Sequence, residues 1–301
     1  EVTDYKVIAE NDDAKYVQPL KFKMHVLPQF LEGYVHAMRV EGASNHSQEL
    51  YKKVRQSPLF DRKLKMYKVN ANLSSQSEEI GRTRIFPSGW LENESIWLHM
   101  EYKFILELLR CELYEEFYNN FENVFVPFLN PDVYGRSTLE NSSFIVSSAH
   151  EDPHLHGQGF VARLSGSTAE FIHIWLYMNI GKNPFVVNDK GELCLEFKPA
   201  LKGWLFTKKD AQVQWESLTS SQKTVKLPKN TYAFNLLAST LVVYHNPKRL
   251  DTFGKKAAKI HKIDVTYNSK KKVSLDSSFI PAPYANDIRD RKVERIDVYL
   301  S

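Results

Sequence analysis

Residues 160–181, FVARLSGSTAEFIHIWLYMNIG, predict a helix at the point where the character of the chain changes. Ser167 and Glu170 have the spacing of a capping box, so we expect the helix to begin with Ser167 as its N-cap. Gly181 is expected to end the helix. Small hydroxylic residues surround Gly166. Such an opening is either a simple helix cap or an anion site, because its free N–H groups and the helix dipole attract negative charge.

The chain before this helix has the pattern of helices joined by long loops. Periodicity predicts helices over residues 25–42, 47–57 and 96–121, and the last of them carries a wide apolar stripe. Residues 64–84 and 130–164 are polar and rich in loop-forming residues. Long ordered loops usually carry function, so these segments are the first place to look for a site.

After Pro184 the sequence changes to short alternating runs broken by Gly, Pro, Asn and Lys. This pattern is typical of strands and hairpins. The sequence therefore predicts a mixed α and β protein with two domains. Residues 1–185 are expected to form a helical domain and residues 186–301 an antiparallel β-sandwich; the family resemblance described below implies that the helices are the later hairpins of an (α/α) six-hairpin toroid.

Composition restricts the class of protein only loosely. The 301 residues are 43% apolar and 25% charged, as in ordinary globular proteins. A formal net charge of +4 gives no reason to expect a nucleic-acid partner, and no apolar run is long enough for a membrane span. Cys111 and Cys194 match no metal or redox spacing, so we expect a reduced, cytoplasmic protein. Because the chain opens on Glu1, we expect it to be a processed chain or the rear piece of a longer one.

Three segments combine Gly, Ser, Asn, His and acidic residues: residues 86–99, 134–160 and 163–171. Each leads into or borders a predicted helix. In a helical toroid such segments gather at one mouth of the barrel, and we expect a single site there.

These segments resemble the motifs of one enzyme family. ENESIWLH (92–99) is similar to E-N-G-G-x-x-x-H, HEDPHLHGQG (150–159) to G-P-x-H-x-x-x-G-x-G, and RLSGSTAEF (163–171) to W-L-T-G-T-A. GELCLEFKPALKGW (191–204) resembles G-L-x-I-x-P-x-L-P-x-x-W. The order and spacing of the four motifs match glycoside phosphorylases of the cellobiose phosphorylase type, glycoside hydrolase family 94 and its relatives. Four ordered motifs are a much more specific signal than any one of them.

The resemblance implies an inverting phosphorolysis of β-glucan oligosaccharides to α-glucose 1-phosphate, with inorganic phosphate as co-substrate and no other cofactor. Carried over by position, His99, Ser165, Gly166 and Ser167 hold the phosphate, and Glu92 lies at the sugar site. The Ser165 hydroxyl and the N–H groups from Gly166 onward are suited to an anion that must be held but left free to react.

The chain departs from the family pattern at several positions. Glu94 and Ser95 replace two glycines, Ser165 replaces a threonine, and Val146 stands where a glutamine is expected. These changes argue against cellobiose phosphorylase itself and favour the relatives that act on β-1,3-gluco-oligosaccharides (family 149).

The family's general acid, an aspartate after an asparagine, has no convincing counterpart in this chain. Asn11, Asp12 and Asp13 give the nearest local match, but they lie too close to the start of the chain. The catalytic acid therefore stays unassigned. We expect the rest of the same polypeptide, or a preceding chain, to supply it, and a homodimer is a further arrangement to test.

Other residues in the loops are weaker candidates. Trp90 is the best candidate for stacking on a sugar, and Glu140, which repeats the Glu–Asn pair of Glu92, could line the sugar cleft. His150, His154 and His156 are close in sequence, but no carboxylate or cysteine completes a known metal site, so we expect loop structure there and no metal.

Two rival functions stay open. A non-catalytic carbohydrate-binding module would bind oligosaccharide without phosphate. A phosphorylase-like domain of a β-glucan synthase would cut or close the polymer that the synthase makes.

Overall fold

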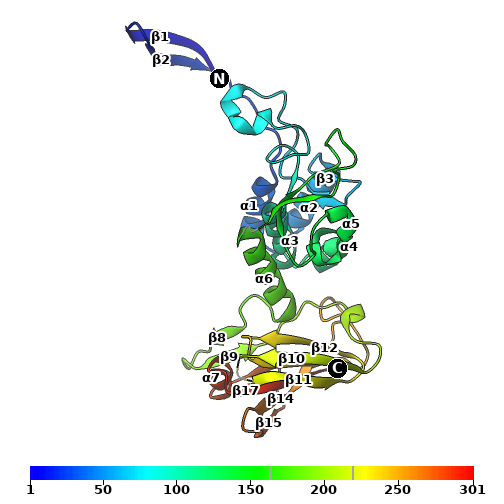
Figure 1. The fold of residues 1–301 in the computed structure, drawn as a ribbon. Helices are drawn as coiled ribbons and strands as arrows, with labels where there is room; N and C mark the ends of the chain where they lie inside the picture. The colour runs from blue at the N-terminus through cyan, green and yellow to red at the C-terminus, as the bar shows by residue number, and fades with distance from the viewer. Residues whose placement is uncertain (163–164, 219) are drawn as a thin grey trace.

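The computed structural model describes residues 1–162, 165–218 and 220–301 of the chain. It is a mixed α and β structure with three parts, a projecting N-terminal hairpin, a helical part and a β part (Figure 1). The helices are α1 (Leu31–Glu41), α2 (Asn45–Gln56), α3 (Leu98–Arg110), α4 (Tyr114–Val124), α5 (Pro131–Tyr134), α6 (Ser165–Asn179) and α7 (Tyr284–Arg289). In the described residues the helices do not close into a barrel.

The strands fall into three groups along the chain. The N-terminal hairpin is β1 (Val2–Glu10) and β2 (Lys15–Phe22). The helical part contains β3 (Phe60–Asp61), β4 (Met66–Tyr67), β5 (Ile96–Trp97), β6 (Ser142–Ile145) and β7 (Gly159–Ala162). The β part contains β8 (Phe185–Val187), β9 (Leu193–Glu196), β10 (Ala211–Ser217), β11 (Ser220–Leu227), β12 (Thr231–Leu236), β13 (Thr240–His245), β14 (Ile260–Tyr267), β15 (Lys272–Leu275), β16 (Phe279–Ile280) and β17 (Val293–Leu300).

The first two predicted helices are confirmed, with a correction at the start of one. α1 ends where Gly42 adopts a positive φ of 60° and its N–H donates to the carbonyl of Met38. It begins at Leu31, not at residue 25. α2 begins after Ser44, whose side chain accepts a hydrogen bond from the N–H of Ser47 and so caps the helix.

The predicted single helix over residues 96–121 is wrong, because the chain turns between α3 and α4. Glu112 adopts a left-handed φ of 58°, and the N–H of Leu113 donates to the carbonyl of Leu108 at 2.8 Å. This hydrogen bond closes the end of α3 in the manner of a Schellman motif. The apolar residues of this stretch do face the core. Because the chain turns, they lie on two helices, and Phe104 of α3 and Phe117 of α4 are both fully buried.

The two predicted loop regions contain short strands. β5, β6 and β7 form a three-stranded antiparallel sheet in which Ile96 pairs with Ile145 and Phe144 pairs with Phe160. β5 leads directly into α3, and β7 lies just before α6 in the chain. The sheet therefore brings together the segments that precede α3 and α6. The sequence predicts that the mouth of a barrel does this, but the described residues form no barrel.

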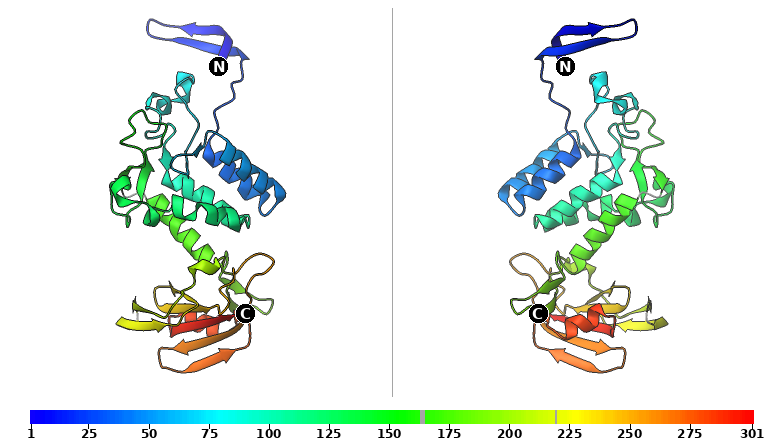
Figure 2. Two further views of the ribbon diagram at one scale, coloured as in Figure 1. Left: turned by 90° about the vertical axis from the view of Figure 1, so that its right-hand side faces the viewer. Right: turned by 90° about the vertical axis from the view of Figure 1, so that its left-hand side faces the viewer.

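α6 starts earlier than predicted. It begins at Ser165, so Ser167 is the third residue of the helix and not its N-cap. The predicted end is correct, since Gly181 has a φ of 110° and donates to the carbonyl of Tyr177. In two further views α6 runs from the helical part to the β part (Figure 2).

The predicted change to strands is confirmed. The largest sheet has the order β12-β13-β17-β14-β15, and its β13–β17 pair is parallel, which corrects the expectation of purely antiparallel pairing. One face, with Tyr244 and Val298, joins the main core. On the other face Leu241 and Val243 pack against Trp215 of the β10–β11 hairpin.

One core runs through the helical and β parts. The Tyr244 hydroxyl donates to the carbonyl of Asn179 at 2.7 Å, and the Tyr118 hydroxyl donates to the carbonyl of Ala200 at 2.6 Å. The division at residues 185 and 186 therefore stays a prediction. By contrast, every residue of β1 and β2 is exposed. None of the helices in the described ranges has the length and apolar character needed to cross a membrane.

Candidate functional site

The structure brings His99, the second residue of α3, against the first turn of α6. A Cβ atom added to Gly166 would lie only 2.6 Å from Nδ1 and 2.7 Å from Cε1 of the His99 ring. No side chain can occupy that space while the ring stays in place. The glycine therefore serves to admit an imidazole ring, whereas the sequence suggested close approach of an anion.

The other two expected phosphate ligands are placed differently. The backbone of Ser165 opens α6, but its side chain lies outside the described part of the structure. Ser167 is fully buried. Gly166 is partly exposed beside His99, whereas Ser167 is enclosed. The N–H groups of both residues were expected to face phosphate.

His99 is surrounded by charged groups from three helices. Its Nε2 lies 3.8 Å from Oε1 of Glu170 on α6. Lys103, one turn along α3, forms an ion pair of 2.9 Å with Glu32 of α1. Burial lowers the pKa of His99 below its ordinary value and Lys103 lowers it further, while Glu170 and Glu32 partly oppose both effects. Burial and Lys103 thus favour the neutral imidazole.

The turn over residues 92–95 is clamped to the segment that follows β4. The side-chain amide of Asn70 donates to the carbonyl of Glu92 at 2.6 Å, and its oxygen accepts from the N–H of Glu94 at 2.8 Å. Asn93 is fully buried; its amide donates to the carbonyl of Phe86 at 2.8 Å and its oxygen accepts from the N–H of Leu73 at 3.1 Å. The backbone beside Glu92 is therefore fixed.

Glu94 occupies a left-handed conformation with a φ of 60°, which a glycine adopts without strain. Its buried carboxylate accepts hydrogen bonds from Lys68 at 2.7 Å and from Asn72 at 2.6 Å. Burial opposes ionisation of Glu94, but these hydrogen bonds outweigh it and lower the pKa of the carboxyl group. The chain has a glutamate where the motif that it resembles has a glycine, and the buried carboxylate of Glu94 is paired with Lys68.

The side chain of Glu92 is about one-third exposed and lies 3.1 Å from Arg82. Arg82 itself is mostly exposed. In the described residues no hydrogen bond or ion pair joins Glu92 to His99, from which it is separated by β5. The structure therefore fixes the backbone of Glu92 and leaves its carboxylate accessible.

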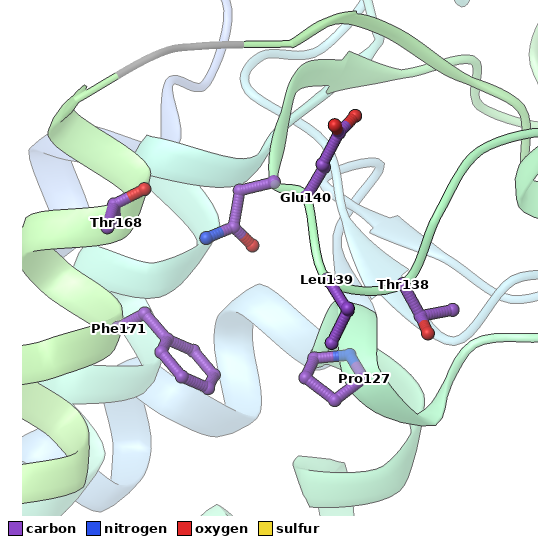
Figure 3. Close-up of a pocket in the computed structure, with 7 residues that line it drawn as sticks. Pro127, Thr138, Leu139, Glu140, Thr168 and Phe171 are labelled. Atoms are coloured by element: carbon purple, nitrogen blue, oxygen red, sulfur yellow. The ribbon is translucent and has the colours of Figure 1, made fainter.

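A pocket of about 450 Å³ adjoins the start of α6 (Figure 3). Thr168 and Phe171 of α6 and Pro127 line it together with the segment 138–141, which includes Glu140. The Tyr134 hydroxyl holds the carbonyl of Glu140 at 2.8 Å. Glu140 thus lines a pocket beside the helix that carries Gly166, and its binding to sugar stays a prediction.

Trp90 is packed among aromatic rings. Its centroid lies 4.7 Å from that of Phe160, 5.2 Å from that of Phe144 and 6.0 Å from that of His150. The indole is partly buried over β6 and β7. This packing accounts for the tryptophan without a ligand, and sugar stacking on Trp90 stays a prediction.

The clustered histidines take part in loop structure. Nδ1 of His150 accepts from the N–H of Asp152 at 3.1 Å. The ring of His156 bonds the carbonyl of His150 at 2.8 Å through Nε2 and lies 2.7 Å from Lys63 through Nδ1. His154 is exposed. In residues 1–162, 165–218 and 220–301, no group of three or more His, Cys, Asp or Glu side chains is placed to hold a metal ion.

Sequence reasoning missed the partners of the expected site residues. It assigned Glu170 to a capping box, although the spacing of four residues from Gly166 places both on one face of α6. It gave no role to Lys68 and Lys103, because nothing local distinguishes them from solvated lysines. For this chain, neither a scan against protein-family models nor a search of curated proteins gives a significant match.

Proposed function

We propose that this chain is the C-terminal part of an inverting glycoside phosphorylase, and that His99 and the start of α6 form its phosphate site. The substrate class is a β-gluco-oligosaccharide, with β-1,3 linkage favoured by the sequence resemblance, and the product is α-glucose 1-phosphate. The contact between His99 and Gly166 is the observation that carries the proposal. Two residues from motifs about 70 positions apart in the chain meet at a helix start, where anions are stabilised.

In the proposed reaction a phosphate oxygen attacks the anomeric carbon as the bond to the leaving oxygen breaks. Attack from the opposite face inverts the configuration, so a β-glucoside gives an α-phosphate. The leaving oxygen takes a proton from a carboxylic acid that this chain does not identify. Asp12 and Asp13 are poor candidates, because they lie in the exposed turn of the N-terminal hairpin, where the Asn11 side chain accepts from the N–H groups of Asp13 and Ala14.

The role of the chain's own residues is positioning. His99 and the N–H groups at the start of α6 orient the phosphate, which is the main way that a bound nucleophile is made reactive. The pocket lined by Glu140 and Thr168 lies beside this helix start and is the proposed place for the sugar. We further propose that the helical part joins earlier hairpins of a larger toroid and that the β part follows it as a sandwich.

The decisive experiment is an assay of the full-length protein. It is incubated with β-1,2, β-1,3 and β-1,4 gluco-oligosaccharides, with and without inorganic phosphate, and α-glucose 1-phosphate is measured. Phosphate-dependent release supports the phosphorylase and identifies the linkage. Binding without release favours a carbohydrate-binding module, and chain cleavage or closure without phosphate favours a domain of a glucan synthase.

The role of His99 is tested with His99→Ala. Losing one charge-assisted hydrogen bond costs about 1.5–3 kcal/mol, so the apparent KM for phosphate should rise roughly 10- to 100-fold, and the KM for the glucan should change far less. Synthesis from glucose 1-phosphate should be weakened as well, because one site serves both directions. His46→Ala, at an exposed histidine of α2, is the control. Normal phosphate dependence combined with weak oligosaccharide binding in His99→Ala would make His99 a sugar ligand.

A further inference from the structure

A second pocket adjoins the one that Glu140 lines. It has a volume of about 260 Å³ and lies where the helical part meets the β part, between residues of α4, α6 and β12. The two pockets share Pro127 and Phe171 as lining residues. Figure 3 shows these two side chains on the side of the first pocket away from Glu140. The second pocket therefore continues the first on the side away from the carboxylate.

The wall of this second pocket, which we call the aromatic pocket, is apolar almost throughout. Most of its side chains are aromatic: Phe121, Phe125, Phe128, Phe171, Trp175 and Tyr232. The ring centroid of Phe121 lies 5.2 Å from that of Phe125 and 5.1 Å from that of Phe128. Phe125 is only 2% exposed, whereas Phe128 is 50% exposed. The aromatic pocket is thus anchored in the core at one end and open at the other.

The first pocket has a different chemical character. Glu140, Asn141 and Thr168 place a carboxylate, an amide and a hydroxyl group around it. Such groups are hydrogen-bond partners for the hydroxyl groups of a sugar. The two adjoining pockets therefore match a ligand that has one polar end and one apolar end.

The aromatic pocket is poorly suited to a second sugar ring. Its wall offers few donors or acceptors, so sugar hydroxyl groups buried there would lose hydrogen bonds to water without replacing them. Water in the pocket is held weakly for the same reason, and its release favours an apolar group. An apolar cavity of about 150 Å³ holds a benzene molecule, so the aromatic pocket has room for an aryl group of one or two rings.

We propose that the aromatic pocket binds the apolar group of a glucoside whose sugar lies in the pocket lined by Glu140. This rests on the proposed function, which places a sugar in the first pocket, and it narrows the substrate class to glucosides that carry an aryl or alkyl group. Continuity of the two pockets through Pro127 and Phe171 is the observation that carries it.

The test compares methyl, phenyl and naphthyl β-glucosides by calorimetry on the full-length protein. Binding of the naphthyl compound should be about 10- to 100-fold tighter than that of the methyl compound, with phenyl between them, because each ring removes more apolar area from water. Free naphthol should bind more weakly than the naphthyl glucoside, since it lacks the sugar contacts.

Two variants of the aromatic pocket should reduce this preference. Phe128→Ser removes a half-exposed ring from the wall and should weaken naphthyl binding about 3- to 10-fold, without affecting the methyl glucoside. Leu205→Phe places a larger side chain in the same wall and should also disfavour the naphthyl group. Phe279→Ser is the matched control, because this phenylalanine of β16 is 41% exposed and does not line the pocket.

A variant of the first pocket separates the two ends of the ligand. Glu140→Gln should weaken the methyl and naphthyl glucosides equally, so that the ratio of their affinities stays as in the wild type.

The failures are distinguishable. Equal affinity for methyl and naphthyl glucosides would overturn the aromatic pocket's role, as when a preceding part of the polypeptide covers it, whereas phosphate-dependent release of glucose 1-phosphate tests the proposed function separately. A preference that survives both Phe128→Ser and Leu205→Phe would place the apolar group elsewhere and overturn the inference. Binding of naphthol as tight as that of its glucoside would contradict the sugar pocket, and the inference with it.

Discussion

The turn over residues 92–95 and the start of α6 belong to two of the four motifs that carry the resemblance, and they are built in opposite ways. In the turn, Asn93 and Glu94 are buried and hydrogen-bonded to residues of the 68–74 segment. At the start of α6, His99 and Gly166 are in contact but partly exposed, and the ion pair to Glu170 is long. The first region is fixed by satisfied hydrogen bonds, whereas the second packs a partly exposed imidazole ring against a glycine, with a carboxylate 3.8 Å from Nε2.

Lys68→Met should have the largest effect, because it leaves the Glu94 carboxylate buried without its cation. Removing one member of a buried ion pair typically costs about 3–5 kcal/mol of stability. Glu94→Gly in the same background should recover much of the loss, since glycine is unstrained at the φ of 60°. Urea unfolding of both variants measures this. Equal losses in Lys68→Met and in the double variant would show that the pair does not hold the turn.

Asn93→Ala should cost about 2–3 kcal/mol, because it leaves the carbonyl of Phe86 and the N–H of Leu73 without partners in a buried place. The matched control is Asn141→Ala in the second Glu–Asn pair. Asn141 accepts from the Tyr102 hydroxyl at 3.1 Å and lines the pocket, so its loss should cost less than half as much. Thermal unfolding compares the two, and similar values would remove the distinction between them.

Gly166→Ala should change the position of His99 more than the stability of the fold. An added methyl group lies within 2.6 Å of Nδ1 and must displace the ring, yet alanine favours a helix over glycine by up to about 1 kcal/mol. We expect a change in unfolding free energy within about 1 kcal/mol together with a shifted His99 NMR signal and weaker phosphate dependence. Gly33→Ala, on α1 where an added methyl group meets no neighbour, is the control. An unchanged His99 signal would mean that the ring is not held against α6.

The smallest expected effect is on acid stability. Because the pKa of Glu94 is lowered in the folded protein, the folded state binds fewer protons than the unfolded state below the ordinary value of 4.5. The stability that Glu94 contributes is therefore fully present above that value and is lost as the pH falls through the lowered pKa. Glu94→Gln should be less stable at neutral pH and should lose less stability between pH 5 and pH 3. Parallel curves for the two proteins would assign the acid sensitivity elsewhere.

The sequence by itself determined the elements with strong local signals. Gly42 and Gly181 ended helices where predicted, because glycine adopts a positive φ without strain. The change from helices to strands after Pro184 followed from the periodicity of the apolar residues. The contact between His99 and Gly166 was expected from the order of the motifs, on the hypothesis that the two motifs form one site.

Only the tertiary structure decided the turn at Glu112, the strands β6 and β7 in a predicted loop, and the partners of the site residues. Glu170 faces His99 and does not cap α6 through Ser167, because α3 packs against that face of the helix. Lys68 was indistinguishable from a solvated lysine until Glu94 was brought beside it. These outcomes depend on contacts between segments that are distant in the chain, and local propensity contains no information about which side chain will approach from another segment.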